Sequence, residues 1–220
     1  MKSSNSTPFE AVTIQQGRFV ARSVTPSQHT AMAAIQGLRY RYFVTHKKWI
    51  TRHSLTPGYE TDRYDSDSHH LAVFEEERLL GYLRALPWGE DTGFMLDHEF
   101  RCLVPDEEFS NLHRQNSLEI SRLVLTPDLS ADVSFLVTEL LFKLLYYCCL
   151  EQQIEHLYAV VEVGWLRRFK SCFHLPFQPL GASQRFPDGT RTVAIHAGVR
   201  ELEQSLRAAV PQKLRWYQQR

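Results

Sequence analysis

The sequence has no net charge, no apolar run of membrane length and few cysteines. Its 220 residues carry 25 Lys and Arg against 25 Asp and Glu, so no net field draws the chain to nucleic acid or to an anionic membrane. No apolar stretch is long enough for a membrane span. The four cysteines lack CxxC spacing: Cys102, Cys148, Cys149 and Cys172. We therefore expect reduced thiols in a cytoplasmic protein with no nucleic-acid partner and no membrane span.

Common catalytic signatures are also missing. There is no G-x-S-x-G elbow and no P-loop, and Ser121 has no histidine nearby in the sequence, so Ser-His-Asp hydrolysis lacks support. The ten histidines form no H-x-x-x-H or H-E-x-x-H pattern, and we expect no metal site. The first eight residues are polar and serine-rich, without an apolar signal core, which argues against secretion.

Periodicity predicts one folded domain behind a short extension. We expect residues 1–16 to be disordered and residues 17–220 to form a single domain. Helical spacing predicts helices at 28–44, 133–150, 165–173 and 199–219, with a polar linker at 106–116. Strands are predicted at 17–24, 70–75, 79–86, 117–125, 156–163 and 192–197. This order predicts an α/β fold with a single mixed, mostly antiparallel sheet flanked by helices on both faces.

One region of the sequence concentrates charge where a fold would bury it. Glu60, Asp62 and Asp65 lie within six residues, and Arg84 and Arg122 lie in segments that otherwise read as core strands. Such charges are costly unless they are paired, so the pattern predicts a buried or half-buried polar cluster. Grouped carboxylates bind a metal or an ammonium or sulfonium ligand. The alternatives are a solvated acidic turn and a structural salt-bridge network without chemistry.

Strict alternation assigns the side chains of the strand at 117–125 to two faces. Glu119 and Ser121 are predicted on one face, and Leu118, Ile120 and Arg122 on the other. A β-bulge would change that assignment. Nearby aromatic residues are interpreted either as core or as a lid over an adenine ring or an acyl chain: Phe43, Trp49, Trp88 and Phe100.

Taken in order, these motifs resemble the acyl-homoserine lactone synthases, the autoinducer synthases of quorum sensing. The resemblance covers the first half of the chain well and the second half only by pattern. Five pieces carry it: Leu38-Arg39-x-x-x-Phe43-x-x-x-x-x-Trp49, Glu60-x-Asp62-x-Tyr64-Asp65, Gly81-x-x-Arg84-x-Leu86-Pro87, Met95-Leu96-x-x-x-Phe100 and Glu119-x-Ser121-Arg122.

The resemblance implies a fold similar to the Gcn5-type N-acetyltransferases (GNAT). It implies acyl transfer to the amine of S-adenosylmethionine from acyl carrier protein or coenzyme A, then lactonisation with loss of methylthioadenosine. S-adenosylmethionine would be a substrate, and no cofactor is expected. The matched positions imply catalytic roles for Glu119, Asp62 and Arg122. They imply substrate-binding roles for Arg39, Phe43, Trp49, Glu60, Asp65, Arg84 and Phe100.

The second half of the chain adds an expected acyl slot between the strand at 156–163 and the helix at 133–150. We expect Leu140, Leu144 and Val161 to line it. Many members of the family carry Thr or Ser near this slot, where this chain has Val160-Val161-Glu162, so we expect a product without a 3-oxo group. The helix at 165–173 carries Arg167, Arg168 and Lys170, which suit an acidic carrier protein or a coenzyme A phosphate, or simply face solvent.

Two other readings stay open. Ser68-His69-His70 after the acidic motif is similar to N-acyl amino acid synthases and exosortase-associated acyltransferases, whose amine acceptor is not S-adenosylmethionine. The other reading is a non-catalytic domain that binds an acyl carrier protein or a ligand.

Overall fold

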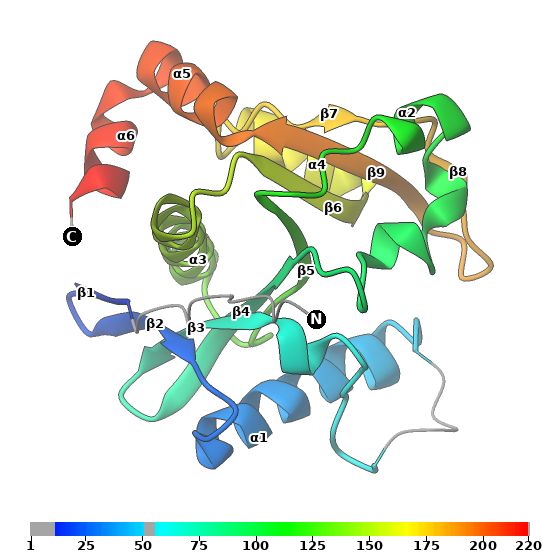
Figure 1. Ribbon diagram of the computed structural model, residues 1–220. Helices are drawn as coiled ribbons and strands as arrows, with labels where there is room; N and C mark the ends of the chain where they lie inside the picture. The colour runs from blue at the N-terminus through cyan, green and yellow to red at the C-terminus, as the bar shows by residue number, and fades with distance from the viewer. Residues whose placement is uncertain (1–11, 51–55, 220) are drawn as a thin grey trace, which may run out of the picture.

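Within residues 12–50 and 56–219, which the computed structural model describes, nine strands form one sheet. Its order is β1-β2-β3-β4-β5-β6-β9-β7, with β8 paired to β9 (Figure 1). β5 and β6 run parallel, and the other paired neighbours run antiparallel. The strands are β1 (Thr13–Gln16), β2 (Phe19–Val24), β3 (His69–Glu75), β4 (Arg78–Pro87), β5 (Ser117–Leu125), β6 (His156–Glu162), β7 (Gln178–Pro179), β8 (Gln184–Arg185) and β9 (Arg191–Gly198).

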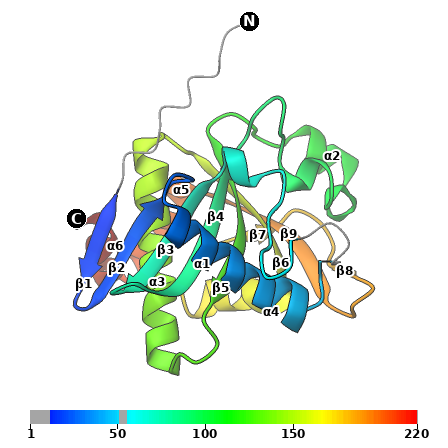
Figure 2. The same cartoon turned by 90° about the horizontal axis from the view of Figure 1, so that it is seen from below.

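Helices cover both faces of this sheet. α1 lies across β3, β4 and β5 (Figure 2), and α3 packs on β2, β3 and β4 from the opposite side. The predicted fold class is therefore confirmed. The α-helices are α1 (His29–Arg39), α2 (Asp106–Ser110), α3 (Ala131–Glu151), α4 (Val163–Ser171), α5 (Val199–Ala209) and α6 (Pro211–Gln218). A π-helix and short 3-10 turns complete the elements: η1 (Tyr40–His46), η3 (Asp65–Asp67), η4 (Met95–Asp97) and η5 (Arg101–Leu103).

Several predicted boundaries need correction. The expected disorder at 1–16 is wrong for β1, which pairs with β2; residues 1–11 lie outside the described residues. The signal was weak because Ile14 is the single buried residue of that strand. The helix predicted at 28–44 changes to π-helical winding at Tyr40. The predicted linker contains α2, and Pro211 starts a separate α6 where one terminal helix was expected.

α3 is long and apolar enough to cross a membrane by length and composition. However, 67% of its apolar window is buried inside the protein. Val137, Leu141 and Leu144 are fully enclosed against the sheet and the neighbouring helices. The apolar character of this helix is therefore accounted for by its position in the core.

Gly81 lets α3 approach β4 closely. A Cβ at this position would lie 2.6 Å from Val137 Cγ1 and 2.7 Å from Leu125 Cδ2. We expect Gly81→Ala to lower the free energy of unfolding by about 1–3 kcal/mol, because overpacking displaces core side chains. Urea denaturation measures this, with Gly164→Ala on α4 as the control, since a Cβ there meets nothing within 4 Å. Equal losses in both variants would contradict the packing argument.

The sheet divides where β5 and β6 separate. Their parallel pairing covers Ser117–Ile120 and His156–Ala159. Beyond these residues β5 stays paired with β4, and β6 stays paired with β9. The described strands therefore diverge from Ser121 and Val160 onward and leave a gap between the two parts of the sheet.

A β-bulge lies on β5 at this same point. The β4–β5 register shifts between Tyr82 and Arg84, because β5 contains one extra residue there. Arg122 adopts a left-handed backbone with φ of 55°, a conformation that costs a non-glycine residue about 1 kcal/mol or more. The bulge turns Arg122 to the side of Ser121 and Arg84, where it pairs with Glu60. The alternation that predicted Arg122 on the opposite face from Ser121 is therefore wrong.

Candidate active site

Three arginines and three carboxylates from distant elements form one closed ionic cluster. Arg39 comes from α1, Arg84 from β4 and Arg122 from the β5 bulge. Glu60 and Asp62 lie in the loop before η3, and Asp65 is the first residue of η3. Arg39 Nη1 and Arg84 Nη1 lie 2.7 and 2.8 Å from Asp65 Oδ1. The remaining pairs are Arg39–Glu60, Arg39–Asp62, Arg84–Asp62, Arg122–Glu60 and Arg122–Asp62. The cluster therefore balances its own charge, as the sequence predicted for charges inside strands.

Burial divides this cluster into an inner and an outer part. The side chains of Arg39, Arg84 and Glu60 are 0%, 0% and 1% exposed, whereas those of Asp62, Asp65 and Arg122 are 20%, 14% and 14% exposed. The inner part anchors the outer part. The outer part is the surface that a ligand can reach.

Asp65 is held ionised by its partners. Burial would raise the pKa of its carboxyl group, but Arg39 and Arg84 outweigh that effect and lower the pKa to about 2. The Asp62 backbone N–H donates to Asp65 Oδ2 at 3.0 Å, and the Tyr64 N–H donates to Asp62 Oδ1 at 3.0 Å. These bonds fix the acidic loop before any ligand binds.

Glu119 lies on the same face of β5 as Ser121, but it is not a member of the ionic cluster. Its side chain is 1% exposed and accepts a hydrogen bond of 2.5 Å from the Met95 backbone N–H. Burial raises the pKa of Glu119 to about 8, in spite of that bond and the charge of Arg84. Arg84 also donates from Nε to Ser121 Oγ at 2.9 Å. A buried carboxyl with a raised pKa beside an ionic cluster is a candidate general base.

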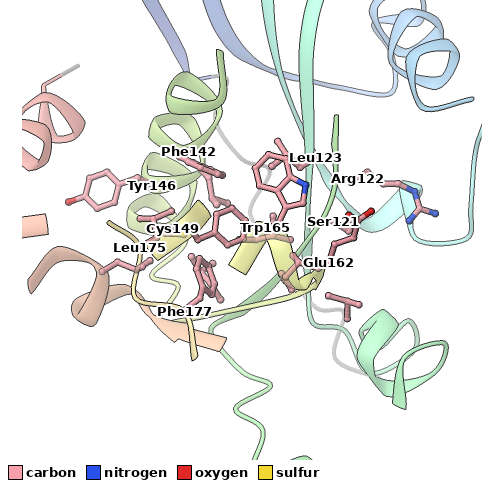
Figure 3. Close-up of a pocket in the computed structure, with 18 of the residues that line it drawn as sticks. Ser121, Arg122, Leu123, Phe142, Tyr146, Cys149, Glu162, Trp165, Leu175 and Phe177 are labelled. Atoms are coloured by element: carbon pink, nitrogen blue, oxygen red, sulfur yellow. The ribbon is translucent and has the colours of Figure 1, made fainter. Parts of the chain in front are cut away.

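A pocket of about 150 Å³ occupies the gap between β5 and β6. At one end it meets Ser121, Arg122 and Glu162, with the Arg122 guanidinium turned away from the cavity (Figure 3). At the other end, Phe142 and Phe177 close in from α3 and from the segment before β7 (Figure 3). The pocket therefore joins a charged end to an apolar interior.

The predicted site residues divide into those that meet at this place and those that lie elsewhere. Phe43, Trp49 and Val161 line the pocket. Phe100 instead packs against Phe186 in a separate core cluster. Leu140 and Leu144 were predicted to line the slot, but they are fully buried in the core. The described wall of the pocket takes other residues from α3: Phe142, Leu145, Tyr146 and Cys149.

Part of the pocket wall was not predicted from the sequence. Val199, Leu202 and Leu206 of α5 and Tyr217 of α6 line the pocket. The α5 residues repeat at helical spacing, which is the signal for a buried face. What that face covers depends on the path of the chain after β9, which the spacing does not reveal.

An ion pair spans the charged end of the pocket. Lys47, just after η1, donates to Glu162 Oε1 at 2.7 Å, and its ammonium lies 4.8 Å from the centre of the Trp49 ring. Because Glu162 ends β6, this contact ties the α1–η1 side to the far strand of the gap. Among the described residues, no group of three or more His, Cys, Asp or Glu is placed to hold a metal ion.

Comparison with known proteins identifies the fold. Residues 38–137 match a family model described as an acetyltransferase (GNAT) domain. The acyl-homoserine lactone synthase BjaI, solved with S-adenosylmethionine and isopentyl-CoA, is 23% identical over 88% of this chain and 87% of its own, with a TM-score of 0.66. The chain has the GNAT fold. No curated protein matches by sequence.

Two further GNAT-fold structures widen the comparison. The acyl-homoserine lactone synthase LasI is 18% identical over 86% of this chain and 95% of its own, with a TM-score of 0.68. FeeM, an N-acyl amino acid synthase from uncultured soil microbes, is 19% identical over 87% of this chain and 96% of its own, with a TM-score of 0.60. The solved structures to which this chain is similar therefore include both acyl-homoserine lactone synthases and an N-acyl amino acid synthase.

Proposed function

We propose that the protein is a cytoplasmic acyl-homoserine lactone synthase. It transfers an acyl group from acyl carrier protein or coenzyme A to the amine of S-adenosylmethionine and then closes the lactone. One observation carries this proposal: Arg122 belongs both to the outer part of the ionic cluster and to the wall of the apolar pocket. A zwitterionic acceptor and an acyl tail can therefore meet at one place.

The outer part of the cluster suits the charges of S-adenosylmethionine. Asp62 and Asp65 face the ammonium and sulfonium groups, and Arg122 faces the carboxylate. Arg39 and Arg84 have no exposed side-chain surface, so they act by holding the acids in place. Phe43 and Trp49, with ring centres 5.9 Å apart, offer aromatic surface for the adenine ring.

In the first step the amine of S-adenosylmethionine becomes acylated. Glu119 accepts a proton from the ammonium through a water, and the free amine attacks the thioester carbonyl carbon. The resulting oxyanion takes hydrogen bonds from backbone N–H groups where β5 and β6 diverge. The C–S bond of the thioester then breaks, and the thiol leaves with a proton from the attacking nitrogen.

In the second step the lactone closes. A carboxylate oxygen attacks the γ-carbon next to the sulfonium, the C–S bond at that carbon breaks, and neutral methylthioadenosine leaves. No proton moves in this step, so positioning is the main requirement. Arg122 meets this requirement because it can hold the carboxylate beside the acylated amine.

The second candidate function is acylation of another amino acid. The FeeM match supports it, because the same outer cluster recognises any α-amino acid through its ammonium and carboxylate. The sulfonium and the adenosyl group that it carries distinguish S-adenosylmethionine from another amino acid. A non-catalytic acyl-binding domain is the third candidate.

Thiol release separates these candidates. The protein is incubated with acyl thioesters of coenzyme A and of acyl carrier protein, and free thiol is measured with S-adenosylmethionine, with a mixture of amino acids, or with neither. We expect release that depends on S-adenosylmethionine. Thiol release with amino acids but not with S-adenosylmethionine would establish the second candidate. If no acceptor caused thiol release, the non-catalytic acyl-binding domain would be the remaining candidate.

A further inference from the structure

The chain turns sharply where it leaves η1. The Trp49 backbone N–H donates back to the Phe43 carbonyl at 2.9 Å. Lys48, just before it, has a left-handed backbone with φ of 58°, which is costly for a residue other than glycine. The turn places the Lys47 ammonium 4.8 Å from the centre of the Trp49 ring. A strained turn therefore sets a cation against an aromatic face.

Two acids from the far part of the sheet meet these side chains. Glu162, the last residue of β6, accepts a hydrogen bond from Lys47 Nζ at 2.7 Å. Asp188, in the turn between β8 and β9, accepts a hydrogen bond from the Trp49 indole N–H, and its charge also acts on Lys47. We call Lys47, Trp49, Glu162 and Asp188 the clasp. It joins the exit of η1 to β6 and to the turn before β9.

The charges of the clasp persist at neutral pH. Asp188 Oδ1 accepts from the Thr190 hydroxyl at 2.8 Å and from the Thr190 N–H at 3.0 Å. These bonds, together with that from Trp49, lower the pKa of the Asp188 carboxyl group. Burial would lower the pKa of Lys47, but the hydrogen bond to Glu162 and the nearby charges outweigh burial and raise it. Lys47 and Asp188 therefore remain ionised.

Packing alone does not fix the Trp49 ring. The residue is 39% exposed, and its ring centre lies 5.9 Å from that of Phe43 and 6.5 Å from that of Tyr42. All three rings line the pocket, together with Glu162. A side chain this exposed keeps its rotamer freedom unless further contacts remove it. The clasp supplies one contact to the face of the ring and another to its indole N–H.

Extending the proposed function, on which this step rests, we infer that Lys47, Glu162 and Asp188 are positioning residues that hold the Trp49 ring for the adenine of the acceptor. A ring that is fixed beforehand loses less conformational freedom when the ligand binds, so the clasp tightens binding. Its members lie outside the bonds that form and break, so the turnover of the saturated enzyme does not depend on them. The signature of the clasp is a change in affinity without a change in kcat.

Amine labelling tests the clasp without any acceptor. Lys47 and its exposed neighbour Lys48 are acetylated with the N-hydroxysuccinimide ester of acetic acid, and the two rates are compared by mass spectrometry. The ion pair should slow the labelling of Lys47 about threefold or more relative to Lys48, and Glu162→Gln should remove that protection. Glu75→Gln is the control, because Glu75 of β3 forms an ion pair of similar length, 2.8 Å, with Arg18. It should leave the protection unchanged.

Calorimetric titration with S-adenosylmethionine tests the positioning role. Lys47→Met, Glu162→Gln and Asp188→Ala should each weaken binding about three- to tenfold, the size of a partly exposed ion pair or a cation–π contact. Lys47→Arg should stay within about twofold of wild type, because arginine also pairs with a carboxylate and stacks on an aromatic ring. Glu75→Gln should not change the dissociation constant. In steady-state kinetics the three weakened variants should keep kcat within about twofold of wild type.

The outcomes separate this inference from the proposed function. Unprotected Lys47 in the wild type, no binding by the wild type, or equal dissociation constants in all variants would overturn the inference. So would a fall in kcat in the weakened variants, or equal losses in Lys47→Arg and Lys47→Met. Weaker binding confined to the three weakened variants supports it. If binding weakens in that way but no methylthioadenosine forms, the inference stands and the proposed function fails. If methylthioadenosine and lactone form while every variant binds S-adenosylmethionine equally, the reverse holds.

Discussion

Replacing Glu119 with glutamine is expected to slow acyl transfer by about 10²–10⁴-fold, the usual loss when a general base is removed. Glutamine has nearly the same shape and can still accept the Met95 N–H bond, so the fold should survive. Glu107→Gln on α2, where the side chain is exposed, is the control and should leave the rate unchanged. Steady-state kinetics with S-adenosylmethionine and an acyl thioester measure both variants.

The pH profile tests the same residue independently. Burial raises the pKa of Glu119 from 4.5 to about 8, so the wild-type rate should rise as pH increases through about 8 and the base loses its proton. The glutamine variant should lack that rise. A turnover close to normal, or an unchanged rise with pH in the variant, would remove Glu119 from the role of base.

The free energy of unfolding should also depend on pH through the protonation of Glu119. Between pH 4.5 and about 8 the folded protein keeps a proton on Glu119 that the unfolded chain releases, so the free energy of unfolding falls as pH rises through this window. Glu119→Gln removes that fall. We expect the melting temperature of the variant, relative to wild type, to be higher at pH 8 than at pH 5. Calorimetry at the two pH values measures the difference.

Replacing Asp65 with asparagine is expected to destabilise the fold by about 3–5 kcal/mol, as breaking a buried ion pair does. Asp65 contacts Arg39 and Arg84, and both arginine side chains are 0% exposed. Its loss leaves three buried or partly buried arginines with two carboxylates. Asp67→Asn is the matched control, because Asp67 lies two residues away and contacts Thr92 near the surface. Urea denaturation at pH 7 should show a loss below about 0.5 kcal/mol for the control.

The acid side of the stability curve provides a second readout for Asp65. Its pKa is lowered to about 2 from 3.8, so the stabilisation that it provides is complete above pH 3.8 and is lost as pH falls toward 2. The asparagine variant should lose less stability over that window than wild type. Parallel acid denaturation curves for the two proteins would contradict the pairing.

The parts of the fold that depend on local burial could be predicted from the sequence. β3 and β4 are short, mostly apolar runs joined by a short polar turn, so their hairpin followed directly. α3 repeats apolar residues over five turns after Ser130, whose side chain accepts from the Val133 N–H, and its start was predicted within three residues. Both signals come from residues close together in the chain.

The sequence predicted that the charged residues of the candidate site form ion pairs, but not which residue pairs with which. The cost of burying Arg84 in a strand required a partner, and the acidic loop could supply the carboxylate. The sequence did not assign the pairs, because Arg39, Arg84 and Asp65 come together only when α1 crosses the sheet. The side on which Arg122 lies depends on a one-residue bulge, and alternation cannot detect a bulge.

The lining of the pocket could not be predicted, because it depends on contacts between residues far apart in the sequence. Leu140 and Phe142 are both apolar residues of α3, and helical spacing does not show which of them faces a gap in the sheet. That gap exists because β6 leaves β5 after Ala159 to remain paired with β9. The wall from α5 and α6 follows from the same arrangement.

The stoichiometry of products tests the central claim most directly. The wild-type protein is incubated with S-adenosylmethionine and an octanoyl thioester of coenzyme A or of acyl carrier protein, and the products are quantified by liquid chromatography and mass spectrometry. We predict equal amounts of methylthioadenosine, free thiol carrier and octanoyl-homoserine lactone. Free thiol without methylthioadenosine, or an acylated amino acid without lactone, would contradict the account.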